Sequence, residues 1–317
     1  VQKEPVYILD KLYYSFDRIE IRGNRVNSDS EIIGVLDFGP GENINKDLIS
    51  EKTDLLYGKG WFEKVKYSIV PRNDSLILVF DCKENPKTML YGSLNYDNSL
   101  GTGMILRMKT KNLVFAGSML NIDSYIGEYY RFNISWLQFL NRSQKFGISA
   151  GFRADNTMIP LIELLGEKGE MLNRNFISGL TANRYIGLNH RMSLYLNLEN
   201  STFLPDFLPL QNLKRISYNS LTTGYNYQHN NIDTKHFPDK GTIFRFSAET
   251  SKLQSAILKT DSSRTVYTEK DHGDFTFGRT YSLYGRLKHY FSISSKMTFS
   301  FESNLLLTYE SGEEKSL

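Results

Sequence analysis

The sequence predicts a small α+β domain followed by an antiparallel transmembrane β-barrel that is incomplete at its C-terminal end. Up to about residue 86, the hydrophobic residues follow a strand period, then a helical period twice, then a strand period twice more. From residue 87 onward the period is two almost everywhere, without a convincing amphipathic helix. The mean hydropathy of −0.39 is compatible with a barrel, because a polar interior brings the average close to that of a soluble protein.

The first domain, residues 15–86, is expected to have the element order β-α-α-β-β, after a linker at 1–14. The segment FDRIEIRG, at 16–23, alternates apolar and charged residues as a half-buried strand does. Ser28 followed by Glu31 is typical of a helix N-cap with a capping box. The Gly-Pro-Gly run that follows this helix, before residue 42, is expected to stop it.

A second helix and two strands complete this domain. The helix is expected to begin at Asn45 and to end where Gly58 and Gly60 supply open backbone. EKVKYSIVP, at 63–71, alternates as a strand, and LILVFDCKE, at 76–84, is typical of a third and more buried strand.

Two motifs in this segment resemble those of a POTRA domain: I-x-I-x-G-N after the first strand, and L-Y-G-K-G-W-F-x-K-V leading into the second. The resemblance implies that the second strand is an exposed sheet edge, whose unpaired N–H and C=O groups would bind an incoming extended polypeptide. The alternative is an ordinary edge strand protected by Lys64 and Lys66. The implied client-binding residues are Val65, Tyr67 and Ile69.

The second domain, residues 87–317, alternates apolar and polar residues in long segments such as YRFNISW, SLYLNLE, IFRFSAE and MTFSFES. A soluble β-sandwich also alternates, but its strands are mostly about five or six residues long. Here many segments exceed about nine residues and tyrosines cluster near their ends, as in transmembrane barrels. The predicted lipid-facing residues include Tyr130, Phe132, Ile134, Trp136, Leu194, Leu196, Leu198, Phe244, Phe246, Ala248, Met297, Phe299 and Phe301.

Short connections alternate with longer polar ones, which are expected at 155–175, 200–216 and 251–275. Outer-membrane barrels have short periplasmic turns, so the first domain is expected in the periplasm. About eleven strands are expected, near 88–97, 102–114, 118–127, 129–139, 144–155, 176–186, 190–200, 217–230, 241–252, 277–291 and 296–309.

The odd number of strands predicts that the barrel is not closed by this sequence. Bacterial single-chain barrels have an even number of strands, so further strands are expected after Leu317, or a cut in a surface loop. Val1 is expected to be a processed or cut end, because no signal peptide opens the chain and it does not begin with Met.

The opening of the second domain, YGSLNYDNSLGTGMILRMKTKNLVFAGSML, is similar to the first hairpins of the BamA/TamA-like outer-membrane assembly superfamily. The segment YNYQHNNIDTKHFPDKGTIFRFSAE resembles a turn of that superfamily, in which Pro presets the turn and Gly allows positive φ. Its members have about sixteen strands, and their luminal Arg-Gly loop would begin where this sequence ends. The turn residues are Asp233, Phe237, Pro238 and Gly241, and the resemblance implies a lateral seam strand with Leu90, Tyr91, Ser93, Leu94, Asn95 and Tyr96.

No motif in the sequence indicates catalysis, a cofactor or a metal site. Phosphate-binding loops and Gly-x-Ser-x-Gly are absent, and the five histidines are scattered. The single cysteine, Cys82, lies in an apolar strand pattern typical of a core residue. With 38 basic and 35 acidic residues, the net charge of +3 gives no electrostatic argument for nucleic acid.

Two functions remain open. In the first, the barrel anchors and translocates a patatin-like passenger that precedes residue 1, as in relatives that fuse a lipase, one POTRA domain and a barrel. In the second, it is a stand-alone outer-membrane insertase or a two-partner-secretion-type transporter. Both place the chain in the bacterial outer membrane, and both imply the same partners: membrane lipid, an extended polypeptide and accessory periplasmic proteins.

Overall fold

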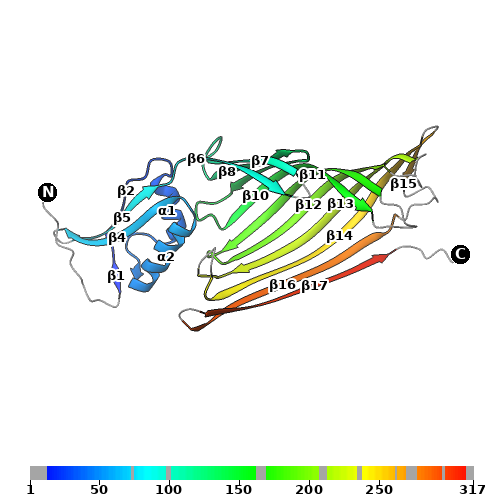
Figure 1. Ribbon diagram of the computed structural model, residues 1–317. Coiled ribbons are helices and arrows are strands. Elements are labelled where there is room, and N and C mark those ends of the chain that lie inside the picture. Colours follow the sequence, from blue (N-terminus) through cyan, green and yellow to red (C-terminus); the bar gives the residue numbers. More distant parts are fainter. Residues whose placement is uncertain are drawn as a thin grey trace.

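The computed structural model describes residues 13–72, 75–97, 101–161, 169–206, 213–233, 238–260, 263–268, 277–294 and 297–311. An N-terminal α+β domain precedes one large antiparallel sheet (Figure 1). None of the helices in these residues is long and apolar enough to cross a membrane.

The N-terminal domain packs two helices on a three-stranded sheet of order β2-β5-β4. Strand β5 lies in the centre, parallel to β2 and antiparallel to β4. The core lies between this sheet and the helices, and Phe16, Ile32, Ile49 and Phe80 are fully buried in it. The elements are β1 (Tyr14–Ser15), β2 (Arg18–Arg22), α1 (Asp29–Leu36), β3 (Asn43–Ile44), α2 (Lys46–Gly58), β4 (Phe62–Arg72) and β5 (Ser75–Glu84).

Local capping explains where both helices begin. The Ser28 side chain accepts from the backbone N–H of Glu31, whose own carboxylate accepts from the N–H of Ser28, so the predicted capping box is confirmed. Asn45 caps α2, since its Oδ1 accepts from the N–H of Leu48 at 2.8 Å. The first helix ends slightly earlier than predicted: α1 stops at Leu36, two residues before the Gly-Pro-Gly run, because Asp37 adopts the left-handed conformation at φ 60°.

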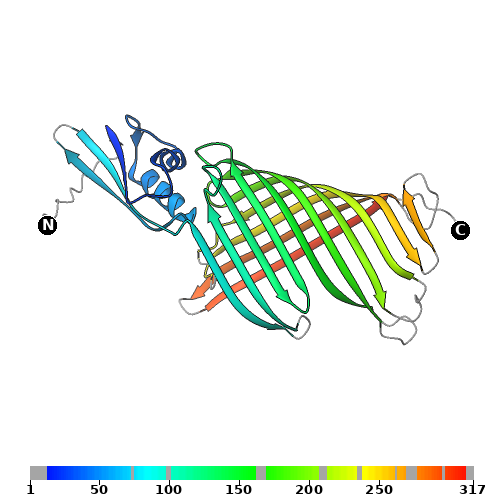
Figure 2. The same ribbon diagram turned by 90° about the horizontal axis from the view of Figure 1, so that it is seen from above.

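The large sheet has eleven strands in the continuous order β17-β16-β14-β13-β12-β11-β10-β9-β8-β7-β6, with the short β15 paired to β14. The sheet is strongly curved, and its two end strands, β6 and β17, lie at opposite edges of its concave face (Figures 1 and 2). The strands are β6 (Thr88–Asp97), β7 (Gly101–Lys111), β8 (Ser118–Gly127), β9 (Tyr130–Phe139), β10 (Phe146–Leu161), β11 (Gly169–Ile186), β12 (His190–Asp206), β13 (Leu213–Asn230), β14 (Gly241–Thr260), β15 (Arg264–Thr268), β16 (Arg279–Ser294) and β17 (Met297–Ser311).

The three long connections were predicted too long. Strand β10 continues to Leu161 and β11 already begins at Gly169, so most of the predicted connection at 155–175 is sheet. Strands β12, β13 and β14 extend in the same way into the other two. In the described extensions, polar residues such as Asn156, Arg174 and Ser255 pair their backbones with a neighbouring strand, and a sequence pattern taken strand by strand does not contain that pairing.

The register confirms the predicted alternation. Leu194 pairs with Tyr225, which pairs with Ala248, so these three side chains lie on the same face of the sheet. Tyr195 and Glu249 lie on the other face and are joined by a hydrogen bond of 2.6 Å. One face of the sheet is therefore apolar and exposed, while polar side chains such as Tyr195 and Glu249 lie on the concave face, where they line a cavity.

Candidate functional site

Strand β4 is an edge strand: within the described residues it pairs with β5 alone. Its predicted client-binding side chains, Val65, Tyr67 and Ile69, are half-buried and pack against the domain core. They therefore do not face outward, and the group available for an incoming strand is the backbone along the free side of β4. The side chains of Lys64 and Lys66 are exposed on the opposite face.

The predicted seam strand is the first strand of the large sheet. In the described part of the chain, β6 pairs only with β7, and β17 at the far end pairs only with β16. Leu90, Leu94 and Tyr96 lie on the apolar face and are 73%, 81% and 72% exposed. The other predicted seam residues, Tyr91, Ser93 and Asn95, alternate with them and lie on the concave face.

The predicted turn motif connects β13 to β14. Asp233 organises it, because its Oδ1 accepts from the backbone N–H of Asp239 at 3.0 Å and of Lys240 at 3.4 Å. Gly241 has the expected positive φ, at +117°, and a Cβ there would lie 2.6 Å from the carbonyl oxygen of Asn231. Pro238 lies in this turn as well, whereas Phe237 lies outside the described residues.

The short turns of the sheet contact the helical side of the POTRA-like domain. Lys145 forms an ion pair of 2.7 Å with Asp37, and the side-chain amide of Asn112 donates to the carbonyl of Val26 at 3.3 Å. Lys111 donates from Nζ to the carbonyl of Gly60 at 2.7 Å. These contacts come from two different turns, so they restrain the orientation of the domain as well as its position.

Two helical glycines allow this close approach. A Cβ on Gly34 in α1 would lie 2.5 Å from the Cβ of Arg142 and 2.8 Å from its backbone carbonyl. A Cβ on Gly58 in α2 would lie 2.6 Å from a methyl group of Leu188. Glycine in a helix costs about 0.5–1 kcal/mol relative to alanine, and here its missing side chain is what makes room for the turns.

Lys59 lies between two aromatic rings of the sheet. Its Nζ is 5.5 Å from the centre of the Phe139 ring and 5.9 Å from that of Tyr185. Burial lowers the pKa of this lysine to about 8, because the charged form loses hydration. The rings offset part of that loss by cation–π attraction.

Glu84 holds the turn that contacts Asn112. Its carboxylate accepts from the backbone N–H groups of Arg25, Val26 and Asn27 at 2.6, 2.7 and 2.9 Å, and from the amide of Asn27 at 2.7 Å. Burial alone would raise the pKa of Glu84, but these donors outweigh it and hold the pKa below the usual value.

The connection from β5 to β6 is short and bonded at both ends. Asn85 donates from its backbone N–H to the carbonyl of Trp61 at 2.8 Å and from its amide to that of Gly60 at 3.2 Å. The carbonyl of Lys87 accepts from the N–H of Lys111 at 3.0 Å. The N-terminal domain therefore joins the first strand of the large sheet with little slack.

Sequence reasoning missed this junction. Gly34 interrupts a helical pattern, and an isolated glycine in a helix is a signal of close packing that could have been followed. Gly58 was predicted only as part of the end of the second helix, where α2 does end. Lys59 and Glu84 carry no such signal, because their partners lie far away in the sequence.

Comparison with known proteins agrees with this architecture. Residues 14–85 match the family described as "POTRA: Surface antigen variable number repeat", so this segment is a POTRA domain. Tyr14, assigned to the predicted linker, is the first residue matched and lies in β1. No curated protein matches the sequence.

Two solved structures share the fold. BamA from Haemophilus ducreyi lacking POTRA domains 1–3 is 13% identical with a TM-score of 0.61, and the similarity covers 94% of this chain and 56% of that chain. CdiB from Escherichia coli is 11% identical with a TM-score of 0.52, and 95% of this chain covers 55% of that chain. The chain thus combines a POTRA domain with a sheet of the BamA-like barrel fold, as the sequence predicted. It spans little more than half the length of these two structures.

Proposed function

We propose that this chain belongs to an outer-membrane barrel that translocates or inserts polypeptide, with its POTRA domain in the periplasm. The observation that carries the proposal is a pair of sheet edges: within the described residues β4 and β6 each pair on one side only, and the short connection from β5 to β6 joins the two sheets that they belong to. An extended client is held by the same backbone hydrogen bonds that join strands in a sheet.

The apolar face of the large sheet supports a membrane location. It exposes leucine and phenylalanine side chains on several strands, including Leu194 and Leu198 in β12, Leu283 in β16, and Phe299 and Leu305 in β17. A continuous apolar face of this size is costly in water but is favourable against lipid chains. The proposed partner of this face is outer-membrane lipid.

The two edges suggest an order of events. A client first adds to β4 beside Lys66 and Ser68, where the exposed backbone lies in the periplasm. It then reaches β6, which the short connection keeps close to the POTRA domain. In lipid every backbone group needs a partner, so a client strand that pairs with β6 gains hydrogen bonds that it cannot obtain alone.

The nature of the client leaves two versions of this function. In the first, the client is a patatin-like passenger encoded upstream in the same protein; in the second, it is a separate polypeptide, as for an insertase or a two-partner-secretion transporter. The intact mass of the native protein from outer membranes separates them. The measured mass is compared with the 36.6 kDa of this chain. An additional mass as large as a folded enzyme domain supports the passenger, and an additional mass that corresponds to only a few β-strands supports the separate client.

Photocrosslinking tests the client path. A photoreactive phenylalanine analogue replaces Lys66 in β4, Tyr91 in β6 or, as a control, the exposed Glu51 in α2. With a urea-denatured, radiolabelled outer-membrane protein as client, we expect adducts from positions 66 and 91 and none from 51. Equal labelling from all three positions, or none from 66 and 91, would contradict the proposed path.

A further inference from the structure

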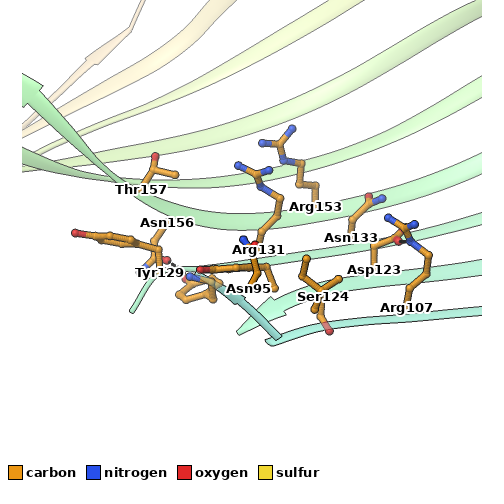
Figure 3. A pocket seen from close by; sticks show the side chains of 13 residues that line it. Asn95, Arg107, Asp123, Ser124, Tyr129, Arg131, Asn133, Arg153, Asn156 and Thr157 are labelled. Carbon is orange, nitrogen blue, oxygen red and sulfur yellow. Dashed lines mark hydrogen bonds and ion pairs between the residues drawn. The ribbon is translucent and has the colours of Figure 1, made fainter. Parts of the chain in front are cut away.

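A cavity of about 490 Å³ lies on the concave face of the large sheet, toward the strand ends that point away from the POTRA domain. Three arginines from three strands line it: Arg107 in β7, Arg131 in β9 and Arg153 in β10 (Figure 3). The register explains their convergence, because Arg107 pairs with Asp123, Asp123 with Asn133, and Asn133 with Arg153. Arg131 lies two residues from Asn133 in the same strand and therefore on the same face.

The three guanidinium groups are only partly neutralised. Arg107 pairs through its Nε with Asp123, and Arg153 pairs through its Nε with Asp155 at 2.6 Å. Within the described residues the side chain of Arg131 has no hydrogen-bond or ion-pair partner, while its backbone pairs with the neighbouring strands. The site therefore carries three positive and two negative groups, and the terminal nitrogens of Arg131 remain available as donors.

The neighbouring asparagine side chains add uncharged hydrogen-bond donors to the cavity. The Oδ1 of Asn156 accepts from the backbone N–H of Tyr130 at 2.6 Å, which leaves the Nδ2 of Asn156 as a donor. Asn133 lies between the arginines, and the guanidinium groups of Arg131 and Arg153 extend to the same side of the strands (Figure 3). Planar arginine forks with neighbouring amide donors match a carboxylate or another oxyanion.

We propose that this cavity binds carboxylate side chains of a polypeptide as it passes the concave face. The inference rests on the proposed function and adds a chemical preference to it: acidic segments are held at the end of the path away from the POTRA domain. A polypeptide is favoured over a lipid headgroup because the cavity lies on the polar face, opposite the apolar face that would meet lipid.

Peptide binding to the purified full chain in detergent tests the site. The probe is a fluorescein-labelled twelve-residue Gly/Ser peptide with four glutamates, compared with the same peptide carrying glutamines. We expect the glutamate peptide to bind more tightly, and Arg131→Gln to weaken its binding about tenfold, as for the loss of one charge-assisted hydrogen bond. Arg131→Lys, which keeps the charge but loses the planar fork, should fall between the two.

Arg184→Gln is the matched control, because Arg184 stacks on Phe146 at the other end of the sheet and should leave binding unchanged. Equal binding of both peptides, or an Arg131→Gln affinity equal to wild type, overturns the inference. It is also overturned if lipopolysaccharide binding, and not peptide binding, falls in Arg131→Gln. Client crosslinking from position 66 that persists in any of these cases shows that the carboxylate site fails while the proposed function stands.

Discussion

The contact between Gly34 and Arg142 predicts that one substitution has opposite effects on the POTRA domain and on its junction with the sheet. In the isolated domain, Gly34→Ala removes a flexible residue from α1 and should stabilise the fold by about 0.5–1 kcal/mol. In the full chain, the new Cβ would lie 2.5 Å from the Cβ of Arg142. Carbon atoms prefer about 3.5–4.0 Å, so the turn or the domain must move by about 1 Å.

The movement falls on backbone as well as side chain, because the carbonyl of Arg142 would lie 2.8 Å away. Overpacking of this kind costs about 1–3 kcal/mol, which exceeds the gain in the helix. Gly58→Ala is the matched control: its nearest neighbours are the methyl groups of Leu188, which rotate more easily than backbone moves, so the junction should change less.

Spin labels on Glu51→Cys and Leu113→Cys, both exposed positions, measure the distance between the two domains by pulsed electron paramagnetic resonance. Native Cys82 does not interfere, since burial, with Asp81 and Glu84, raises its pKa to about 11. We expect a broader and shifted distance distribution for Gly34→Ala and a near-native one for Gly58→Ala. The packing argument would be refuted if the distances for Gly34→Ala were unchanged and the substitution raised the unfolding free energy equally in the isolated domain and in the full chain.

Three further predictions concern single residues of the junction and the turn. Glu84→Gln should lower the unfolding free energy of the POTRA domain by about 2 kcal/mol at pH 7, because charge-assisted hydrogen bonds are lost. In the wild type, this stabilisation should be present above the unfolded pKa of Glu84 and disappear as pH falls through its lowered folded pKa. Urea titrations at several pH values would measure both effects. The folded pKa of Lys59, about 8, lies below its ordinary 10.5, so the unfolded state binds more protons than the folded state between these two pH values. The wild-type protein should therefore become more stable as pH rises from 8 to 10. In thermal unfolding, Lys59→Met should not show this increase in stability with pH. Gly241→Ala should hinder barrel assembly, since alanine at φ +117° is strained by about 1–3 kcal/mol and its Cβ would clash with backbone. The heat-modifiable migration of the assembled protein on gels would measure the loss of assembly. Assembly at the wild-type level would contradict the prediction.

Much of this molecule follows from local sequence. The helix starts depend on Ser28, Glu31 and Asn45, whose caps involve residues only three positions away. The alternation around Leu194 and Phe299 likewise depends only on the period of a strand, so the face of each residue could be predicted without knowing its neighbours.

Tertiary structure decided the features that depend on partners far away in the chain. The ends of β10 and β11 depend on which strand lies beside them, and so does the central position of β5 between β2 and β4. Gly34, Lys59 and Glu84 became functional candidates only when the fold brought them to turns or loops that are far away in the sequence. The same junction contains the ion pair between Lys145 and Asp37, which are 108 residues apart. Periodicity and capping are properties of short segments, whereas packing and desolvation are properties of the contacts that folding creates.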